Sequence, residues 1–410
     1  MHQTANSVSN HHPKQLSFSD NAMVDNPYLF YHQLRETSPV YQMQQGRWLI
    51  SRYANAVSLL NSPQCDHWGQ NLRDMSRLHP TEAALAQCLQ VLAPNHAVPF
   101  RQAVHSVVAR ALNEQATAMT HRADALLQSL RDRPHIDAMA DYAHPFTFGS
   151  ISQVIGVPEA DISALSEVVG RLQGNYLSCV SAENQENLLQ GDGQVFVDYL
   201  HRLLEEKRRA PQTDLISQLI QVAEHADPDV MSEAGLINLL ILLFYAGHQN
   251  MMNFIGNALL ALFQHPDSCT ALRQDPALMD KAIIELLRFD SPVQYILLIA
   301  REAITLRSQV IAPGEEILIG VGAANRDPEV FENPDQLDIH RRPTQHLAFG
   351  AGIFRCIGAQ LAQRQGGIAL SRFLAHITDF QVADEPLRWR TTPMVQRGLY
   401  ALPLAGLNYG

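Results

Sequence analysis

A glycine-rich stretch that ends in a cysteine is the part of this sequence best suited to chemistry. It reads FGAGIFRCIG (residues 349–358) and is followed by an apolar, helix-forming run, residues 359–370. The positive end of a helix dipole and its N–H groups favour a thiolate at such a place. Tight turns and a close approach to a flat, bulky group are allowed by three glycines, Gly350, Gly352 and Gly358. A thiolate presented in this way is a natural axial ligand for haem iron. The alternative is a reduced, buried cysteine beside an ordinary loop, and the offsets of the glycines from Cys356 favour the ligand.

A second feature is the polar centre of an otherwise apolar helix pattern, residues 232–264. The pattern contains no proline, and its apolar residues surround most of the helix, so we expect it to run through the core. Its centre reads Ala246-Gly247-His248-Gln249-Asn250. A glycine in mid-helix costs about 1 kcal/mol relative to alanine, and buried amides need partners. Two interpretations stay open. Either this centre takes part in a reaction, or Gly247 lets another helix pack closely while Gln249 and Asn250 cap buried backbone groups.

A third feature is the sequence Glu285-Leu286-Leu287-Arg288. A glutamate and an arginine three residues apart lie on one face of a helix and can pair. The flanking residues are apolar, which indicates burial, and a buried pair needs further partners to offset its desolvation. Arg341 is a candidate partner.

The elements that position these residues predict a mainly α protein with small β sheets. We expect a disordered tail (residues 1–20) and a single domain (residues 21–410), because glycine and proline, 22 of each, are scattered along the chain. The expected elements, in chain order, are a helix (27–36), two strands (40–44 and 48–51) joined by a hairpin turn at Gln45-Gly46, an irregular segment (62–94) and a helical region (99–208). We expect that helical region to be interrupted near Pro134, near Pro158 and at Gly191-Asp192-Gly193.

Composition limits the possible partners. The five cysteines are an odd number without a CxxC pair, which favours a reducing compartment over a disulfide framework or a structural zinc site. A net charge of −11 disfavours nucleic acid. The longest apolar run, residues 236–247, is too short to span a bilayer, and no basic-then-apolar leader is present. We therefore expect a monomeric, cytoplasmic protein that binds neither nucleic acid nor membrane.

In this order, the three features resemble those of the cytochrome P450 family, the haem-thiolate monooxygenases, and specifically its soluble bacterial branch. The resemblance extends from about Asp25 to Leu404 and includes Ala323-Ala324-Asn325-Arg326-Asp327-Pro328 and Arg397-Gly398-Leu399. It implies the cytochrome P450 fold, with haem b (iron protoporphyrin IX) between the long central helix and the helix after the cysteine loop.

The resemblance also implies roles for individual residues. Cys356 would be the axial ligand of the haem iron, with Phe349 packed against it, and Glu285, Arg288 and Arg341 would form a structural ion-pair triad. The remaining cofactor-binding candidates are Arg101 and His346 at the haem propionates and Arg355 beside the cysteine. The implied lining of the substrate pocket is Val293, Ile296, Leu297 and, more weakly, Leu242, Tyr245, Met394, Val395 and Gln396.

The centre of the long helix departs from the family pattern. Most relatives carry an acid and a threonine there, which organise the proton supply for splitting dioxygen, whereas this chain has Gln249 and Asn250. A glutamine cannot titrate, and an asparagine can hold a water but cannot pass on a proton as a hydroxyl does. With Ala246 and Gly247, these two amides are the candidate catalytic residues, and we expect protons to come through ordered water or the substrate.

The residues expected to bind the haem propionates also depart from the family pattern. Phe354 stands where the family has a histidine or arginine, and Leu298 stands where it has an arginine. His96 lies five residues before Arg101 rather than four. Arg301 or Arg355 could compensate, but we predict weaker haem retention than is usual in the family.

These observations predict oxidation of a small or medium, largely apolar molecule, of the kind found in secondary metabolism. Electrons would come from a ferredoxin and its reductase, which could dock on a basic patch, Arg101, Arg110, Arg342, Arg355 and Arg364. A scattered set of solvated arginines is the other interpretation of that set. Two alternative functions stay open: haem-thiolate chemistry that bypasses dioxygen activation, such as peroxide-driven oxidation, rearrangement, dehydration or oxidative coupling, and a non-catalytic haem-binding or recruitment module.

Overall fold

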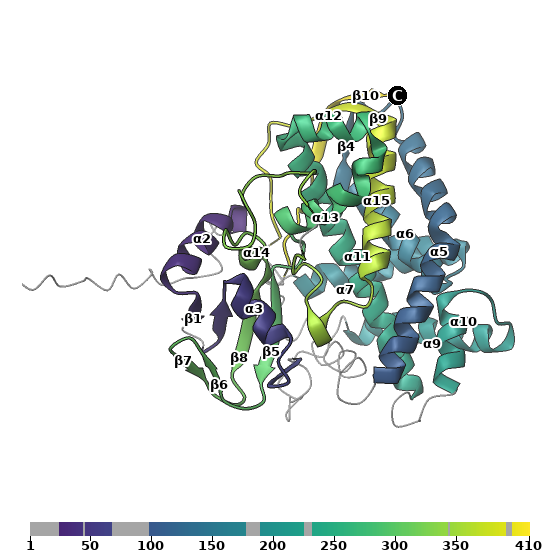
Figure 1. Cartoon of the computed structure of the whole chain (residues 1–410). Coiled ribbons are helices and arrows are strands. Elements are labelled where there is room, and N and C mark those ends of the chain that lie inside the picture. The colour runs from purple at the N-terminus through teal and green to yellow at the C-terminus, as the bar shows by residue number, and fades with distance from the viewer. Residues whose placement is uncertain are drawn as a thin grey trace, which may run out of the picture.

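The computed structural model describes residues 24–43, 46–67, 98–177, 189–224, 232–342, 345–390 and 396–410. Figure 1 shows a β-rich part on one side of the molecule and a larger helical part on the other. The expected tail, most of the expected irregular segment, and His96 lie outside the described residues.

Helices make up most of the described chain, as predicted. The long and medium helices are α5 (Val98–Ser129), α6 (His144–Ile155), α7 (Ile162–Leu177), α9 (Gln194–Arg209), α10 (Leu215–Glu224), α11 (Glu233–Gln264), α12 (Pro266–Gln274), α13 (Met279–Phe289) and α15 (Ala359–His376). Short π- and 3₁₀-helical turns lie between them at η2 (Ala138–Ala143), η3 (Glu159–Asp161), η4 (Leu189–Gly193), η5 (Pro276–Leu278) and η6 (Gly352–Phe354).

The largest sheet has the strand order β1-β2-β8-β5-β3. Its strands are β1 (Val40–Gln42), β2 (Trp48–Ile50), β3 (Cys65–His67), β5 (Tyr295–Ala300) and β8 (Glu316–Gly320), and the helices beside it are α2 (Tyr28–Thr37), α3 (Tyr53–Leu60) and α14 (Val321–Ala324). The pairing of Val40 with Ile50 confirms the predicted hairpin. Cys65–His67, expected to be irregular, instead forms the edge strand β3 through antiparallel pairing with β5.

Two smaller sheets complete the fold. One has the order β4-β10-β9 and consists of β4 (His135–Asp137), β9 (Ile377–Val382) and β10 (Pro403–Tyr409); the other is the hairpin of β6 (Ile304–Leu306) and β7 (Gln309–Ile311). β4 lies at the break in the helical region that the sequence predicts near Pro134, although the strand itself was not predicted. That strand exists because a distant partner, β10, supplies its backbone hydrogen bonds.

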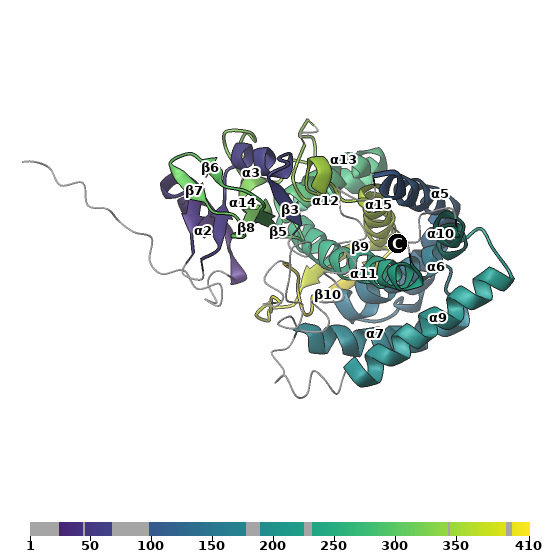
Figure 2. The ribbon, with the colours of Figure 1, turned by 90° about the horizontal axis from the view of Figure 1, so that it is seen from below.

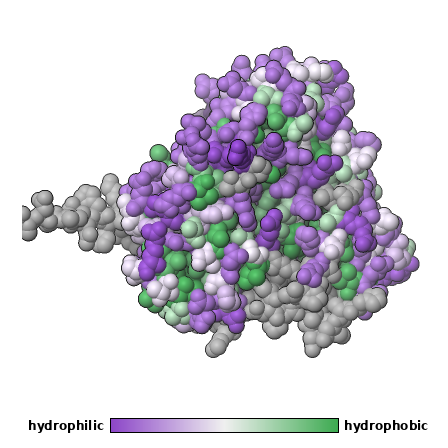
Figure 3. Space-filling model, viewed as in Figure 1, coloured by the Kyte–Doolittle hydropathy of each residue, from purple (hydrophilic) through white to green (hydrophobic). Residues whose placement is uncertain are grey.

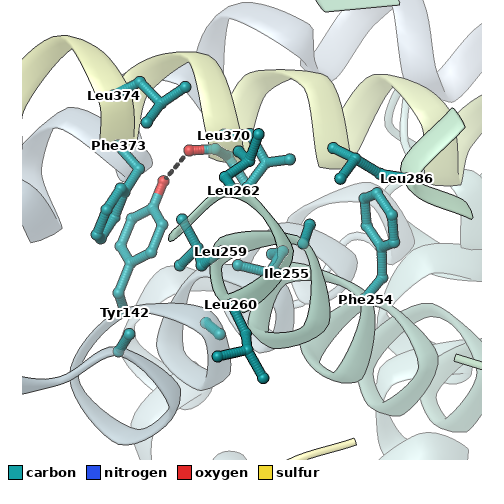
Figure 4. Close-up of a cluster of buried hydrophobic side chains, with 14 of the residues drawn as sticks. Tyr142, Phe254, Ile255, Leu259, Leu260, Leu262, Leu286, Leu370, Phe373 and Leu374 are labelled. Atoms are coloured by element: carbon teal, nitrogen blue, oxygen red, sulfur yellow. Dashed lines mark hydrogen bonds between the residues drawn. The ribbon is translucent and has the colours of Figure 1, made fainter. Parts of the chain in front are cut away.

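The predicted long helix is α11, which lies inside the helical part with α15 beside it (Figures 1 and 2). The Ser232 hydroxyl caps it by accepting from the Gly235 N–H at 3.1 Å. A Cβ added at Gly366 of α15 would lie 2.7 Å from the Phe254 ring of α11, so this glycine lets the two helices approach. Figure 4 shows the packed core around them, where the Tyr142 hydroxyl donates to the Ala369 carbonyl at 2.7 Å.

None of the helices in the described ranges is both long enough and apolar enough to cross a bilayer. The face drawn in Figure 3 is mostly hydrophilic, with hydrophobic residues scattered between the polar ones.

Candidate haem-thiolate site

Backbone hydrogen bonds and two left-handed glycines hold the cysteine loop. Gly350 N–H donates to the Leu347 carbonyl at 2.9 Å, and Cys356 N–H donates to the Phe349 carbonyl at 2.8 Å. Gly350 and Gly352 have φ values of +66° and +55°, where a side chain is disfavoured. A Cβ at Gly350 would also lie 2.6 Å from the Phe354 carbonyl oxygen. The loop therefore needs these glycines to place Cys356, which is exposed, just before α15.

The third glycine has a different surrounding. Gly358, the N-cap residue of α15, has a φ of −89°. Among the described residues, and apart from its chain neighbours and its own helix backbone, an added Cβ would meet only the Cys356 sulfur within 4 Å, at 3.9 Å. The space beside the sulfur is therefore open on the side of this glycine.

Phe354 anchors the loop to the β-rich part. Its side chain is buried in a hydrophobic cluster that also contains Trp48, Leu60 and Leu347. The residue that replaces a basic side chain of the family thus packs against the sheet, while Arg355 beside it is exposed.

The structure brings together the three residues of the expected ion-pair triad. Arg288 donates to both carboxylate oxygens of Glu285, each at 2.7 Å, in a bidentate pair. Arg341 Nε lies 3.2 and 3.1 Å from the same two oxygens. Asp338 N–H donates to Glu285 Oε1 at 3.0 Å. These additional partners offset the desolvation of a pair in which both side chains are almost fully buried.

Asn325 connects this pair to the cysteine loop. Arg288 Nη1 donates to the Asn325 carbonyl at 2.9 Å, and Asn325 Oδ1 accepts from the Leu347 N–H at 2.7 Å. Leu347 in turn accepts from Gly350 in the loop. Asn325 lies in one of the segments that resemble the family, but no role was predicted for it. The available signal was an amide directly after the apolar run that ends at Ala324, because a buried amide must have partners.

His346 is a neutral hydrogen-bond donor beside the loop. Its burial, with the positive charges of Arg288 and Arg355, lowers its pKa to about 4. Its Nδ1 accepts from the Ala348 N–H at 3.1 Å, so the ring proton is on Nε2. The ring of Phe349 lies next to it, with 5.7 Å between ring centroids.

Arg301, one of the two suggested replacements for the lost propionate contacts, has a carboxylate partner in the sheet. Arg301 forms an ion pair with Asp66 of β3, with Nε and Oδ2 3.2 Å apart, so its charge is already matched at the sheet edge. Leu298 is fully buried in the hydrophobic cluster of the sheet. The side chain of Arg101 lies outside the described part of the structure.

The donor set fits a haem group. The thiol of Cys356 is exposed, next to a glycine whose Cα is uncrowded, and it can ligate the iron. The loop needs two positions without a Cβ. His346 offers a neutral N–H that can donate to a carboxylate.

At the centre of α11, two amide side chains bond to other amide side chains. Gln249 is buried, and its Nε2 donates to Asn253 Oδ1 at 3.2 Å. Asn250 Oδ1 accepts from Gln396 Nε2 at 2.8 Å. Gln396 also forms an isolated antiparallel bridge with Val293, so the structure brings Asn250 close to a predicted pocket segment. Neither Asn253 nor the partnership with Gln396 was predicted.

The alternative interpretation of the helix centre is confirmed in one half and wrong in the other. A Cβ at Gly247 would lie 2.6 Å from Ile151 Cδ1 of α6, so Gly247 does permit close helix packing. His248 faces the same helix, with its Nδ1 2.8 Å from the Thr147 hydroxyl. The hydrogen bonds described for Gln249 and Asn250 join side chains, however, and do not cap the backbone.

The predicted pocket residues of β5 point to opposite faces of the sheet, as neighbouring residues of a strand must. Ile296 Cδ1 is 3.5 Å from the position of a Cβ at Gly350, so Ile296 faces the cysteine loop. Leu297 packs instead in a separate cluster that contains Tyr31 and Leu34. Its assignment to the same pocket lining was therefore wrong.

The other pocket candidates are divided between described and undescribed residues. Leu242 is buried, and Tyr245 and Ala246 are half-buried on α11 in the turns before Gln249. Met394 and Val395 lie outside the described residues.

Comparisons with known proteins agree with this geometry. A family model described as Cytochrome P450 matches residues 177–395. The polyketide biosynthesis cytochrome P450 PksS of Bacillus subtilis (strain 168) is 31% identical over 93% of this chain and 96% of its own length. The vitamin D(3) 25-hydroxylase of Pseudonocardia autotrophica is 34% identical over 92% of this chain and 93% of its own length.

Solved structures match over a similar extent. P450BioI, in complex with an acyl carrier protein ligated to hexadec-9Z-enoic acid, superposes with a TM-score of 0.80 at 28% identity. That match covers 94% of this chain and 98% of the other.

Proposed function

Because the chain belongs to the cytochrome P450 family, whose members bind haem b through a cysteine thiolate, we propose that it is a monooxygenase with Cys356 as the axial ligand. Its proposed substrate is a small or medium, largely apolar molecule. The enzyme class, a cytochrome P450 oxidoreductase, agrees with relatives such as the 25-hydroxylase.

The presentation of Cys356 is the observation that carries the proposal. When bound, haem supplies the activation of dioxygen and the insertion of one oxygen atom into the substrate. The chain supplies the thiol at the end of a loop shaped by Gly350 and Gly352. The Glu285–Arg288 pair holds that loop through Asn325. His346 Nε2–H and Arg101 are the two proposed partners of the haem propionates, and the bond from the Ala348 N–H to His346 Nδ1 supports the first of them.

On the other side, Gln249 and Asn250 would organise the proton supply. Neither amide titrates, so the protons of the reaction must come from water or from the substrate. The connection of Asn250 to Val293 through Gln396 supports a role for Asn250 beside the proposed pocket lining, which also includes Ile296 and Leu242.

Electrons would come from a ferredoxin with its reductase. Four of the five arginines suggested for its docking are exposed, Arg110, Arg342, Arg355 and Arg364. We propose that this exposed positive charge lies on the thiolate face, where it would suit an acidic protein partner even though the chain as a whole is acidic.

The first experiment is a carbon-monoxide difference spectrum of the reduced protein, together with that of Cys356→Ala. The red-shifted thiolate band should be present in the wild type and absent in the variant. A wild type without that band would contradict the haem-thiolate assignment and favour the non-catalytic module.

The second experiment separates two chemistries, because the non-titrating amide pair also suits reactions that need no proton relay. Turnover with NAD(P)H, ferredoxin and reductase is compared with turnover driven by hydrogen peroxide. Product formed only with peroxide would assign the chain to dioxygen-independent chemistry instead.

The substrate class can be narrowed with spectral titrations. PksS is named for polyketide biosynthesis, and P450BioI was solved with an acyl carrier protein. We therefore propose a panel of apolar secondary metabolites and fatty acyl chains, each acyl chain offered both free and attached to a carrier protein.

We also predict weak haem retention. Phe354 and Leu298 are buried in the sheet cluster and Arg301 is paired with Asp66, so three positions that could hold propionates do not contribute a charge. Haem occupancy after dilution and gel filtration should fall, and full occupancy under these conditions would contradict the prediction.

A further inference from the structure

Three amides form a row on one face of α11. Gln249, Asn253 and Asn257 are four residues apart, so their side chains lie one above the other along the helix. All three are almost fully buried, at 1%, 0% and 2% exposed. Buried amides are stable only when their donors and acceptors are paired.

The orientation of the last amide in the row is determined by a backbone group. Asn257 Nδ2 donates to the Arg397 carbonyl at 3.2 Å. Because a carbonyl oxygen can only accept, the nitrogen of this amide must face Arg397, and its oxygen must point elsewhere.

Two complementary atoms in the row have no hydrogen-bond partner among the described residues. They are the donor Asn253 Nδ2 and the acceptor Asn257 Oδ1. Residues one turn apart have Cβ atoms about 5–6 Å from each other. A water molecule between them could accept from the first and donate to the second, as buried waters commonly do for such groups.

We propose that a buried water joins Asn253 to Asn257 and that these two asparagines are positioning residues that orient Gln249. In this series of hydrogen bonds the Arg397 carbonyl orients Asn257, the water donates to Asn257 Oδ1 and accepts from Asn253 Nδ2, and Asn253 Oδ1 accepts from Gln249 Nε2. Gln249 is left with its Oε1 as the group it can present to the reaction site. The inference rests on the proposed function only for its consequence in the reaction; the water itself is independent of it.

The neighbouring amide has the opposite polarity. Asn250 Oδ1 already accepts from Gln396, so its Nδ2 is the group that remains to donate. The pair therefore presents an acceptor at Gln249 and a donor at Asn250. A water or substrate hydroxyl can donate to the first and accept from the second, and so be held in one orientation. Without Asn253, the Gln249 amide could rotate and present a second donor, and the hydroxyl would lose its acceptor.

The C-terminal segment packs against this row. A Cβ at Gly398 would lie 2.7 Å from Asn253 Cβ and would also overlap the Asn253 amide group. The missing side chain of Gly398 therefore leaves room for the amide of Asn253, and a substitution there provides a way to displace this amide without changing the sequence of α11.

The first test is a crystal structure of the purified protein at a resolution that shows ordered water. We expect density within hydrogen-bond distance of both Asn253 Nδ2 and Asn257 Oδ1. The absence of such density, or a protein group that bonds to both atoms, would overturn the proposal. This result is independent of haem chemistry, so the inference can fail while the proposed function stands, and the reverse.

The second test uses the infrared C–O stretch of carbon monoxide on the reduced haem protein, which senses donors and acceptors nearby. We expect the band of Asn253→Ala to shift or split, with Gly398→Ala giving a similar change. Asn238→Ala, on the same helix but outside the row, is the matched control and should leave the band unchanged. Retention of the thiolate band in each variant shows that the cysteine side is intact. An unchanged C–O band in a folded Asn253→Ala would overturn the orienting role, and if both variants fail to fold the crystal structure decides.

Discussion

The cysteine loop and the centre of α11 are held by different kinds of interaction. The loop is fixed by left-handed glycines and, through Asn325, by a bidentate ion pair that is almost fully buried. The centre of α11 is held by neutral amides that bond to each other and to the C-terminal segment. Charge-assisted pairs fix one geometry strongly, whereas amides exchange donor for acceptor by rotating about a single bond. The cysteine loop, which must present one sulfur, is thus held by charged groups in a single geometry. The centre of α11, which must organise protons, depends on which way its amide side chains point.

The largest effect should follow from breaking the charged side. Glu285→Ala leaves Arg288 buried without its carboxylate, which should cost about 3–5 kcal/mol of unfolding free energy. Chemical denaturation of the haem protein measures the loss, and haem should be released in the same transition. Glu316→Ala, which removes a more exposed carboxylate paired with Arg47, is the control and should cost much less. Equal losses would show that burial of the pair does not matter.

The second effect concerns the neutral side. Gln249→Glu combined with Asn250→Thr replaces the amides by an acid and an alcohol, which can deliver protons. Turnover with dioxygen and NAD(P)H should rise by about 10²-fold, the low end of what positioned proton transfer contributes, and it should become dependent on pH. Peroxide-driven turnover is the internal control and should change little. If neither rate responds, proton supply through these two positions is not limiting.

A smaller effect on stability should distinguish two glycines of the cysteine loop. Gly352→Ala forces a side chain into a left-handed conformation, at about 1–2 kcal/mol, and brings its Cβ to 2.8 Å from the Leu60 carbonyl oxygen. Gly358→Ala is the matched control, because its φ is −89° and its nearest neighbour is the Cys356 sulfur at 3.9 Å. Thermal unfolding should therefore shift for the first variant only, while the second should chiefly alter the thiolate spectrum.

The same comparison explains how far the sequence could be interpreted. The glycine positions, Glu285, Arg288 and the long helix were predictable because each follows from local chemistry: backbone freedom, same-face spacing and continuous apolarity. The roles of Asn253 and Asn325 were not predictable, since their partners are distant in sequence or depend on which way an amide points. Leu297 was misassigned because the segment was interpreted as an apolar run, and only the register of β5 shows which side chains face the loop.

The smallest effect near neutral pH comes from His346, a buried histidine beside the cysteine loop. Its pKa in the folded protein is about 4, lowered by burial and by Arg288 and Arg355, against about 6.5 in an unfolded chain. Between these two values the unfolded state binds more protons, so the stability contributed by neutral His346 is complete above pH 6.5 and is lost as the pH falls toward 4. The slope approaches about 1.4 kcal/mol per pH unit for one histidine. His346→Gln should flatten the decline in unfolding free energy that denaturation measures between pH 6.5 and 4.5, and it should change little at pH 7.5.

The same decline tests whether a haem propionate lies near His346. Carboxylates of a bound haem close to His346 would raise its pKa and narrow the pH range over which stability is lost. The wild-type decline should therefore be shallower with haem than after haem removal. An equal slope in both forms would indicate that no propionate lies near this histidine.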